Sequence, residues 1–378
     1  MKYLKFIPQI ILVIWMLGCS SGKQAFEKGN YYQSSIKAIE RLRKNPGHKK
    51  SKAVLEQSYP QAVQYHTDQV YQLRRSNDRF KNEQIVNQYN LLNNLYNQIQ
   101  RCPACKDIII SPQNYSDEVR TYSQNAAKFR YEAGKEALET GDRGLAREAY
   151  EHFEIAGSYI RGYRDIETLM DEALELATLK VVVEQVPVPT VNYQLSVEFF
   201  QDQLEEYLYN YHENQFVRFH SPTDRTLKQP DQVMILRFDD FVVGQTKYYE
   251  STRELKKDSV VIGDVELNDG TKKKVYGTVK ADYTEYRQEV KSNGLMSMRI
   301  LEYGTDQVAL SEKLPGEFVW VNRWASFNGD ERALTREQLR ATKSKQRTPP
   351  HHQDMFIEFC KPIYDQFRGT VNSYYRDF

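Results

Sequence analysis

Residues 180–187 read KVVVEQVP, and this stretch decides how the rest of the chain is divided. Its β-branched valines favour a strand, and Pro187 ends that strand because proline has no backbone N–H to donate to a sheet. Before this stretch, apolar residues recur three and four positions apart, which indicates helices. After it, apolar and polar residues alternate in several segments, which indicates strands. The sequence therefore predicts a helical half followed by a half built around a sheet.

Two segments of the helical half, residues 24–178, share a pattern. In the first, the turn Gly29-Asn30-Tyr31 precedes apolar residues at helical spacing, and Pro46 ends the helix. In the second, Gly141-Asp142 lies among small residues that let two helices approach closely: Gly134, Ala137, Ala146 and Ala149. The pattern resembles the tetratricopeptide repeat, in which a proline follows the second helix, as Pro46 follows Gly29 by 17 residues. The resemblance implies repeated helical pairs, and a generic stack of helical hairpins is the alternative.

The second half is predicted to alternate strands with one long helix. A helix with an aromatic face is expected at 196–211. Longer strands are expected at 233–243, 248–255 and 274–286, with chain reversals at 268–270, 292–294 and 304–306. The strand–helix–strand opening and the meander after it resemble the periplasmic α/β domain of the curli-secretion lipoprotein family and the amino-terminal domains of TolB proteins. That resemblance implies an architecture, and we infer no transport activity from it.

These patterns predict an α + α/β protein. A tetratricopeptide-like helical region is followed by a mixed α/β domain whose sheet is largely antiparallel. The expected divisions are a signal peptide at 1–18, the helical domain at 19–178, the α/β domain at 179–345, and a linker with a carboxy-terminal helix at 346–378.

The amino terminus predicts a lipid anchor. Two lysines precede the apolar segment Phe6–Leu17, which is shorter than the ~20 residues of a spanning helix and is typical of a signal peptide. Leu17-Gly18-Cys19 resembles the lipobox of bacterial lipoproteins, which implies that Cys19 is acylated and becomes the first residue. The alternative is an ordinary signal peptide with an incidental cysteine. By resemblance to bacterial sorting rules, Ser20 in place of aspartate favours the outer membrane, and the lack of an acidic run after it favours the periplasmic face.

Composition narrows the classes of partner. Lys+Arg total 52 and Asp+Glu 51, so the net charge of +1 argues against non-specific binding to nucleic acid. The mean hydropathy is -0.71, and no second long apolar run follows the first. We therefore expect partners among other envelope or outer-membrane proteins, and contact with the membrane through the anchor. We expect no cofactor beyond the acyl chains on Cys19.

Three cysteines remain after Cys19. Cys102 and Cys105 are separated by two residues, and in an oxidising envelope compartment they are predicted to form a local disulfide. No βαβ pattern surrounds them, which disfavours a thioredoxin-like role. A zinc site would need four ligands, and no second CxxC or HxxxH occurs. Cys360 is expected to be buried.

The segment 320–334 is the strongest candidate for an interface. Its candidate contact residues are Trp320, Arg323, Trp324, Phe327, Asp330 and Arg332. Tryptophan and arginine are among the residue types enriched at binding hot spots. One interpretation is a recognition loop. The other is a strand end that packs both tryptophans, a turn at Asn328-Gly329, and a helix that begins through a Thr335…Gln338 capping box.

No catalytic pattern is present in the sequence. It has no GxSxG elbow, P-loop, dinucleotide fingerprint or HExxH, and His351-His352 follows a proline-containing, basic stretch typical of an exposed linker. We expect neither an enzymatic nor a metal site. The hypothesis is a lipid-anchored scaffold or accessory subunit of an envelope assembly for outer-membrane insertion, secretion or export. The alternatives are a glycan- or polymer-binding module, or a cell-wall-acting enzyme with an unrecognised site.

Overall fold

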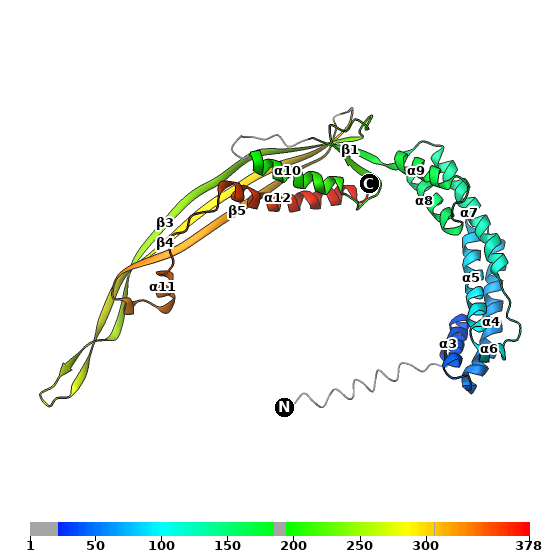
Figure 1. Cartoon of the computed structure of the whole chain (residues 1–378), viewed down its shortest axis with the longest axis horizontal. Coiled ribbons are helices and arrows are strands. Elements are labelled where there is room, and N and C mark those ends of the chain that lie inside the picture. Colours follow the sequence, from blue (N-terminus) through cyan, green and yellow to red (C-terminus); the bar gives the residue numbers. More distant parts are fainter. Residues whose placement is uncertain (1–21, 185–193, 306) are drawn as a thin grey trace. The chain divides into compact units, whose positions relative to one another are not determined.

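A computed structural model describes residues 22–184, 194–305 and 307–378 (Figure 1). The chain divides into two compact units, Met1–Ala177 and Thr178–Phe378, one residue away from the predicted boundary. The first unit is helical, and the second contains a mixed, mostly antiparallel five-stranded sheet. The predicted α plus α/β class is therefore confirmed. The predicted signal peptide and Cys19 lie outside the described residues.

The first unit is a succession of helices in which neighbours along the chain pack together. Its described helices are α2 (Lys23–Glu27), α3 (Tyr31–Lys44), α4 (Lys49–Arg74), α5 (Lys81–Gln100), α6 (Pro103–Lys106), α7 (Ser116–Leu138), α8 (Arg143–Tyr159) and α9 (Ile166–Ala177). Helix α3 packs on α4, α4 on α5, α5 on α7, α7 on α8 and α8 on α9. Each helix therefore buries its apolar stripe mainly against its neighbours.

Two turns of this unit follow from local sequence. Gly29 and Gly141 have φ values of 74° and 70°, which glycine adopts without a steric penalty. The residue after each glycine caps the next helix: the side chain of Asn30 accepts from the N–H of Gln33, and that of Asp142 accepts from the N–H of Leu145. The sequence placed both helix starts correctly for this reason.

The second unit is built on a sheet with the strand order β2-β1-β3-β4-β5. Its strands are β1 (Leu179–Glu184), β2 (Val217–His220), β3 (Gln232–Glu266), β4 (Lys272–Glu302) and β5 (Val308–Gly329). Strand β1 is parallel to β2 and β3, whereas β3, β4 and β5 are antiparallel. We call the last three strands the ribbon. Because Gly329 pairs with Ala281, the β3–β4 hairpin continues beyond the end of β5 (Figure 1).

The predicted reversal at 292–294 is wrong. These residues lie inside β4, and only the reversals at 268–270 and 304–306 join strands, with Asp306 outside the described residues. Ser-Asn-Gly is a turn signal locally, but the glycine is needed here for packing: a Cβ on Gly294 would lie 2.6 Å from the ring of Phe359. The strands predicted at 233–243 and 248–255 are likewise one strand, β3, with a register shift near Gly244, where φ is 78°.

Helices α11 and α12 cover opposite faces of the ribbon, at different positions along its length. The remaining helices of this unit are α10 (Gln194–Tyr209), η3 (Glu331–Ala333), α11 (Arg336–Ala341) and α12 (His352–Tyr375). In β4 the buried residues are odd-numbered from Val279 to Tyr283, where they pack with Leu334 and Ala341. From Gln288 to Ile300 they are even-numbered, on the face that α12 covers. Since successive side chains of a strand point to opposite faces, α11 and α12 lie on opposite faces of the ribbon.

Helix α12 belongs to the core of the second unit. The carboxy-terminal helix predicted within 346–378 is α12. It is not set apart from the α/β domain, because its apolar face is fully buried against the sheet and α10: Phe356, Phe359, Ile363, Phe367 and Val371. The helix also approaches the ribbon closely, since a Cβ on Gly316 of β5 would lie 2.1 Å from the carbonyl oxygen of Phe359. The sheet, α10 and α12 together form one hydrophobic core.

Candidate functional site

The predicted interface residues do not form a recognition loop. Trp320, Arg323, Trp324 and Phe327 lie within β5, and Asp330 and Arg332 follow its end. The alternative interpretation holds for the helix that comes next, because Thr335 and Gln338 form the predicted capping box. The local sequence therefore indicated where the helix begins but not how far the strand extends.

The structure brings the two tryptophans to one face of the ribbon. Trp320 is opposite Val290 and Trp324 is opposite Tyr286 in the ladder between β4 and β5. The rings of Trp324 and Tyr286 are stacked, with centroids 5.4 Å apart and planes at 12°. Phe327 points to the opposite face, where it packs beside Tyr283 in the cluster under α11.

Tyr248 and Tyr286 lie on the same face, although neither was among the predicted interface residues. Tyr248 of β3 is 63% exposed, and its hydroxyl oxygen accepts a hydrogen bond of 3.0 Å from Nε2 of the buried Gln288. The side-chain amide oxygen of Gln288, Oε1, is buried and has no hydrogen-bond partner among the described residues. We call Tyr248, Tyr286, Trp320 and Trp324 the aromatic face. Only the register between the strands, which includes several bulges in β3, places Tyr248 with the other three.

Asp330 and Arg332 join the end of β5 to the hairpin. Their side chains form an ion pair of 2.6 Å, and Arg332 also donates to the carbonyl oxygen of Val261 on β3 at 2.6 Å. The Arg332 side chain and its backbone N–H lower the pKa of Asp330 to about 2. Arg323 is exposed and is opposite Arg287 of β4. The Asp330–Arg332 pair therefore fastens the end of β5 to β3 within the same unit.

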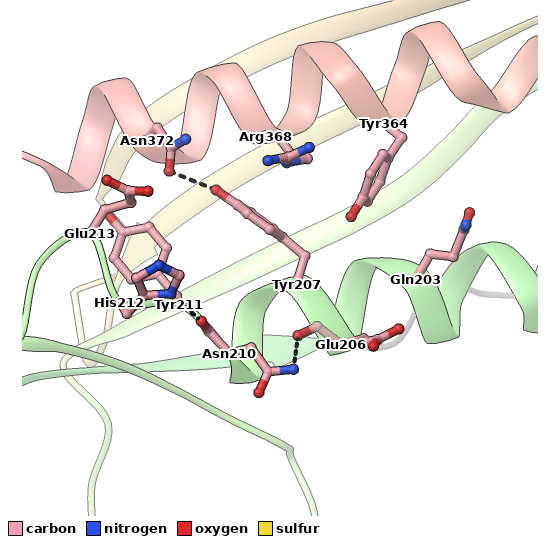
Figure 2. A pocket seen from close by; sticks show the side chains of 10 residues that line it. All are labelled: Gln203, Glu206, Tyr207, Asn210, Tyr211, His212, Glu213, Tyr364, Arg368 and Asn372. Carbon is pink, nitrogen blue, oxygen red and sulfur yellow. Dashed lines mark hydrogen bonds between the residues drawn. The ribbon is translucent and has the colours of Figure 1, made fainter.

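A cleft lies between α10 and α12 in the second unit (Figure 2). Its volume is ≈ 430 Å³, within the range of roughly 300–1,000 Å³ that is typical of ligand pockets. Helix α10 contributes Gln203, Glu206 and Tyr207, and α12 contributes Tyr364, Arg368 and Asn372. The segment 210–213, which follows α10, closes one end.

The walls of the cleft are held by contacts between the two helices. The hydroxyl of Tyr207 donates to Oδ1 of Asn372 at 2.6 Å. The guanidinium of Arg368 lies 5.2 Å from the ring centroid of Tyr207 and 5.8 Å from that of Tyr364, within the range of cation–π contacts. Burial raises the pKa of Tyr207, and it raises the pKa of Tyr211, also in the wall, to about 12. Both phenols are therefore protonated and neutral near pH 7.

The structure gives the state of three cysteines and the position of the His351-His352 pair. Cys102 and Cys105 form a disulfide with an S–S distance of 2.04 Å, and both are buried beside α3 and α5. Cys360 is a free, buried cysteine whose thiol pKa is raised by burial. His351 and His352 are exposed at the start of α12. Within the described ranges, no group of three or more His, Cys, Asp or Glu side chains is placed to hold a metal ion.

No protein-family model matches the chain, and no curated protein matches its sequence. Across residues 22–184, 194–305 and 307–378, no helix combines the length and apolarity needed to cross a membrane. The function is therefore argued from the residues of the chain and their arrangement.

Proposed function

We propose that this chain is a lipid-anchored, non-enzymatic scaffold or accessory subunit of a bacterial envelope assembly, and that it acts by binding other proteins. The lipobox-like Leu17-Gly18-Cys19 supports the anchor. Acyl chains on Cys19 hold the two units at the periplasmic face of the outer membrane, since burial of each CH₂ contributes ~0.8 kcal/mol. The partners are other envelope or outer-membrane proteins.

The open edge of the ribbon is the observation that carries this proposal. Strand β5 pairs with β4 along one side, and in the described part of the chain no strand pairs with its other side. An unpaired strand edge presents backbone N–H and C=O groups to which an extended segment of another protein adds as a further strand. Strand β5 is 22 residues long, and alternate residues along it direct their backbone groups to this edge.

The middle of β5 is the most suitable part of this edge. Proteins protect strand edges with bulges, prolines and charges. Strand β3 has several bulges, and β5 has Pro315 near its start, but the ladder of β5 is regular from Leu310 to Gly329. Val319 and Val321 are 38% and 41% exposed there. A regular edge with exposed β-branched residues favours addition of a partner strand over this segment.

The helical unit offers a second surface for recognition. We interpret α7 and α8 as a tetratricopeptide-like pair, supported by the close approach at Gly134, where a Cβ would lie 2.6 Å from the ring of Phe153. Stacked helical pairs present extended surfaces that recognise partner segments. This unit supplements the edge of β5 as a binding surface.

The test is photo-crosslinking in the cells that produce the lipidated protein. A photoreactive phenylalanine analogue at Val321 is expected to crosslink one partner, which also copurifies in stoichiometric amount from detergent extracts. The same analogue at Tyr303, which is 49% exposed in the turn after β4, is the matched control and is expected to give no such product. Val319→Lys with Val321→Lys should abolish copurification. Absence of any stoichiometric partner overturns the proposal.

A further inference from the structure

The cleft between α10 and α12 is separate from the edge of β5 and has a different chemistry. We propose that this cleft binds a neutral saccharide. The proposal does not depend on the scaffold proposal, because the residues that line the cleft belong to α10, α12 and the segment 210–213, and none of them belongs to β5.

The lining excludes apolar ligands and polyanions. None of the residues that line the cleft has an aliphatic side chain. The charged residues are Arg368 on one side and Glu206 and Glu213 on the other, so with His212 neutral the lining carries a net charge of -1. A lipid chain would meet apolar surface mainly on the tyrosine rings and would bury charged and amide groups beside them, which is unfavourable. The two carboxylates repel a ligand of several negative charges.

The lining matches the groups of a sugar. Each sugar hydroxyl both donates and accepts a hydrogen bond, so a sugar site needs donors and acceptors side by side. Arg368 only donates, the carboxylates of Glu206 and Glu213 only accept, and the amide of Gln203 does both. The C–H face of a sugar ring is apolar and packs on tyrosine rings, which also have a polar tip.

Several of these groups are held in place without a ligand. The Tyr207 hydroxyl is fixed by Asn372, and the ring of Tyr207 lies edge-on to that of Tyr364, with centroids 6.3 Å apart and planes at 79° (Figure 2). Arg368 lies over both rings, and its side chain also hydrogen-bonds to Tyr207. A guanidinium has five N–H donors, so Arg368 keeps donors for a ligand. Side chains that are already ordered reduce the entropy lost on binding.

The test is ligand-observed NMR with the full mature chain. The neutral probes are maltotetraose, mannotetraose and chitotetraose at about 10 mM, a concentration that detects dissociation constants in the millimolar range. Tetragalacturonate is the anionic probe of equal length, and tetra-alanine is the peptide probe. We expect saturation transfer to at least one neutral tetrasaccharide and none to the other two probes.

Two variants locate the binding in the cleft. Tyr364→Ala and Arg368→Met should each weaken saccharide binding by at least about tenfold, that is about 1.4 kcal/mol. Arg368 is exposed, so Arg368→Met tests the site even if Tyr364→Ala fails to fold. Tyr303→Ala is the control and should bind like the unaltered chain. The proposal is overturned if no neutral probe binds, if only tetragalacturonate or tetra-alanine binds, or if Arg368→Met binds the saccharide unchanged.

Discussion

The indole of Trp324 on β5 lies parallel to the phenol ring of Tyr286 on β4, with centroids 5.4 Å apart. The two residues are directly opposite each other in the ladder, so the stack ties the edge strand to the centre of the ribbon. Trp320 lies four residues before Trp324 in β5, so its side chain is on the same face of the ribbon. The third tryptophan of the chain, Trp15, lies in the predicted signal peptide. In a chain without residues 1–18, tryptophan fluorescence would therefore report on the ribbon alone.

The Tyr286–Trp324 stack should appear as a coupling in a double-mutant cycle. Tyr286→Ala and Trp324→Ala are each expected to lower the free energy of unfolding of the second unit. Their combined effect should be smaller than the sum by about 0.5–1.5 kcal/mol, the energy of an aromatic pair beyond its buried area. Urea unfolding followed by Trp320 fluorescence and circular dichroism measures this. Tyr248→Ala, which removes an exposed tyrosine, should show no coupling to Trp324→Ala, and equal coupling in both cycles contradicts the prediction.

The glycines beneath α12 should not tolerate a methyl group. Gly294→Ala is expected to destabilise the second unit by about 1–3 kcal/mol, because overpacking forces side chains and backbone to shift. The new Cβ would lie 2.6 Å from Phe359 and 3.0 Å from Phe241. Denaturant unfolding monitored by tryptophan fluorescence gives the change. Gly263→Ala in β3 is the matched control, since a Cβ there would meet no neighbouring atom within 4 Å. Equal effects of the two substitutions would show that packing under α12 is not the reason for Gly294.

The Asp330–Arg332 pair should contribute to acid sensitivity. The pKa of Asp330 in the folded chain is about 2, below its ordinary value of 3.8, so the folded state binds this proton less readily than the unfolded state. The stability that the ionised Asp330 carboxylate adds to the folded state is complete above pH 3.8, and it is lost as the pH falls through about 2. Asp330→Asn should therefore show a shallower loss of stability between about pH 4 and pH 2. Arg332→Met should have the same effect, because it returns the carboxyl toward its ordinary pKa. An unchanged pH profile in both variants refutes the assignment.

The number of reactive thiols tests both the disulfide and the anchor. The mature lipidated protein, unfolded without a reductant, should react with a thiol reagent at one position, Cys360. In the native state this thiol should not react, because it is buried and its pKa is raised. After reduction, Cys102 and Cys105 add two more thiols. An additional thiol in the unreduced, unfolded protein would show that Cys19 is not acylated.

Local signals in the sequence identified the features that depend on local geometry. The turns at Gly29 and Gly141 and the capping box at Thr335 rest on residues no more than three positions apart, so the sequence was sufficient for them. The turn predicted at 292–294 is wrong because the glycine at 294 leaves room for the ring of Phe359. Phe359 lies 65 positions further along the chain, so local sequence does not report this contact.

The candidate sites depend on contacts that periodicity does not report. Trp324 and Phe327 are three residues apart and lie on opposite faces, which is clear only once the strand is known to continue through both. The cleft joins Tyr207 to Asn372, and its hydrogen bond spans 165 positions. The sequence predicted the aromatic face of α10 and a carboxy-terminal helix, but not that these two helices pack side by side.

The buried residues of β4 are odd-numbered near α11 and even-numbered near α12. This switch of the buried face restricts how many residues can be inserted into or deleted from the ribbon. Tyr283 faces α11 and Gln288 lies on the face of α12, with an unbroken ladder between them. One extra residue between these two positions would turn the side chains of one whole end of the strand to the wrong face. Two extra residues, with matching additions in β3 and β5, would preserve both. Insertions and deletions in this part of the ribbon are therefore expected only in even numbers.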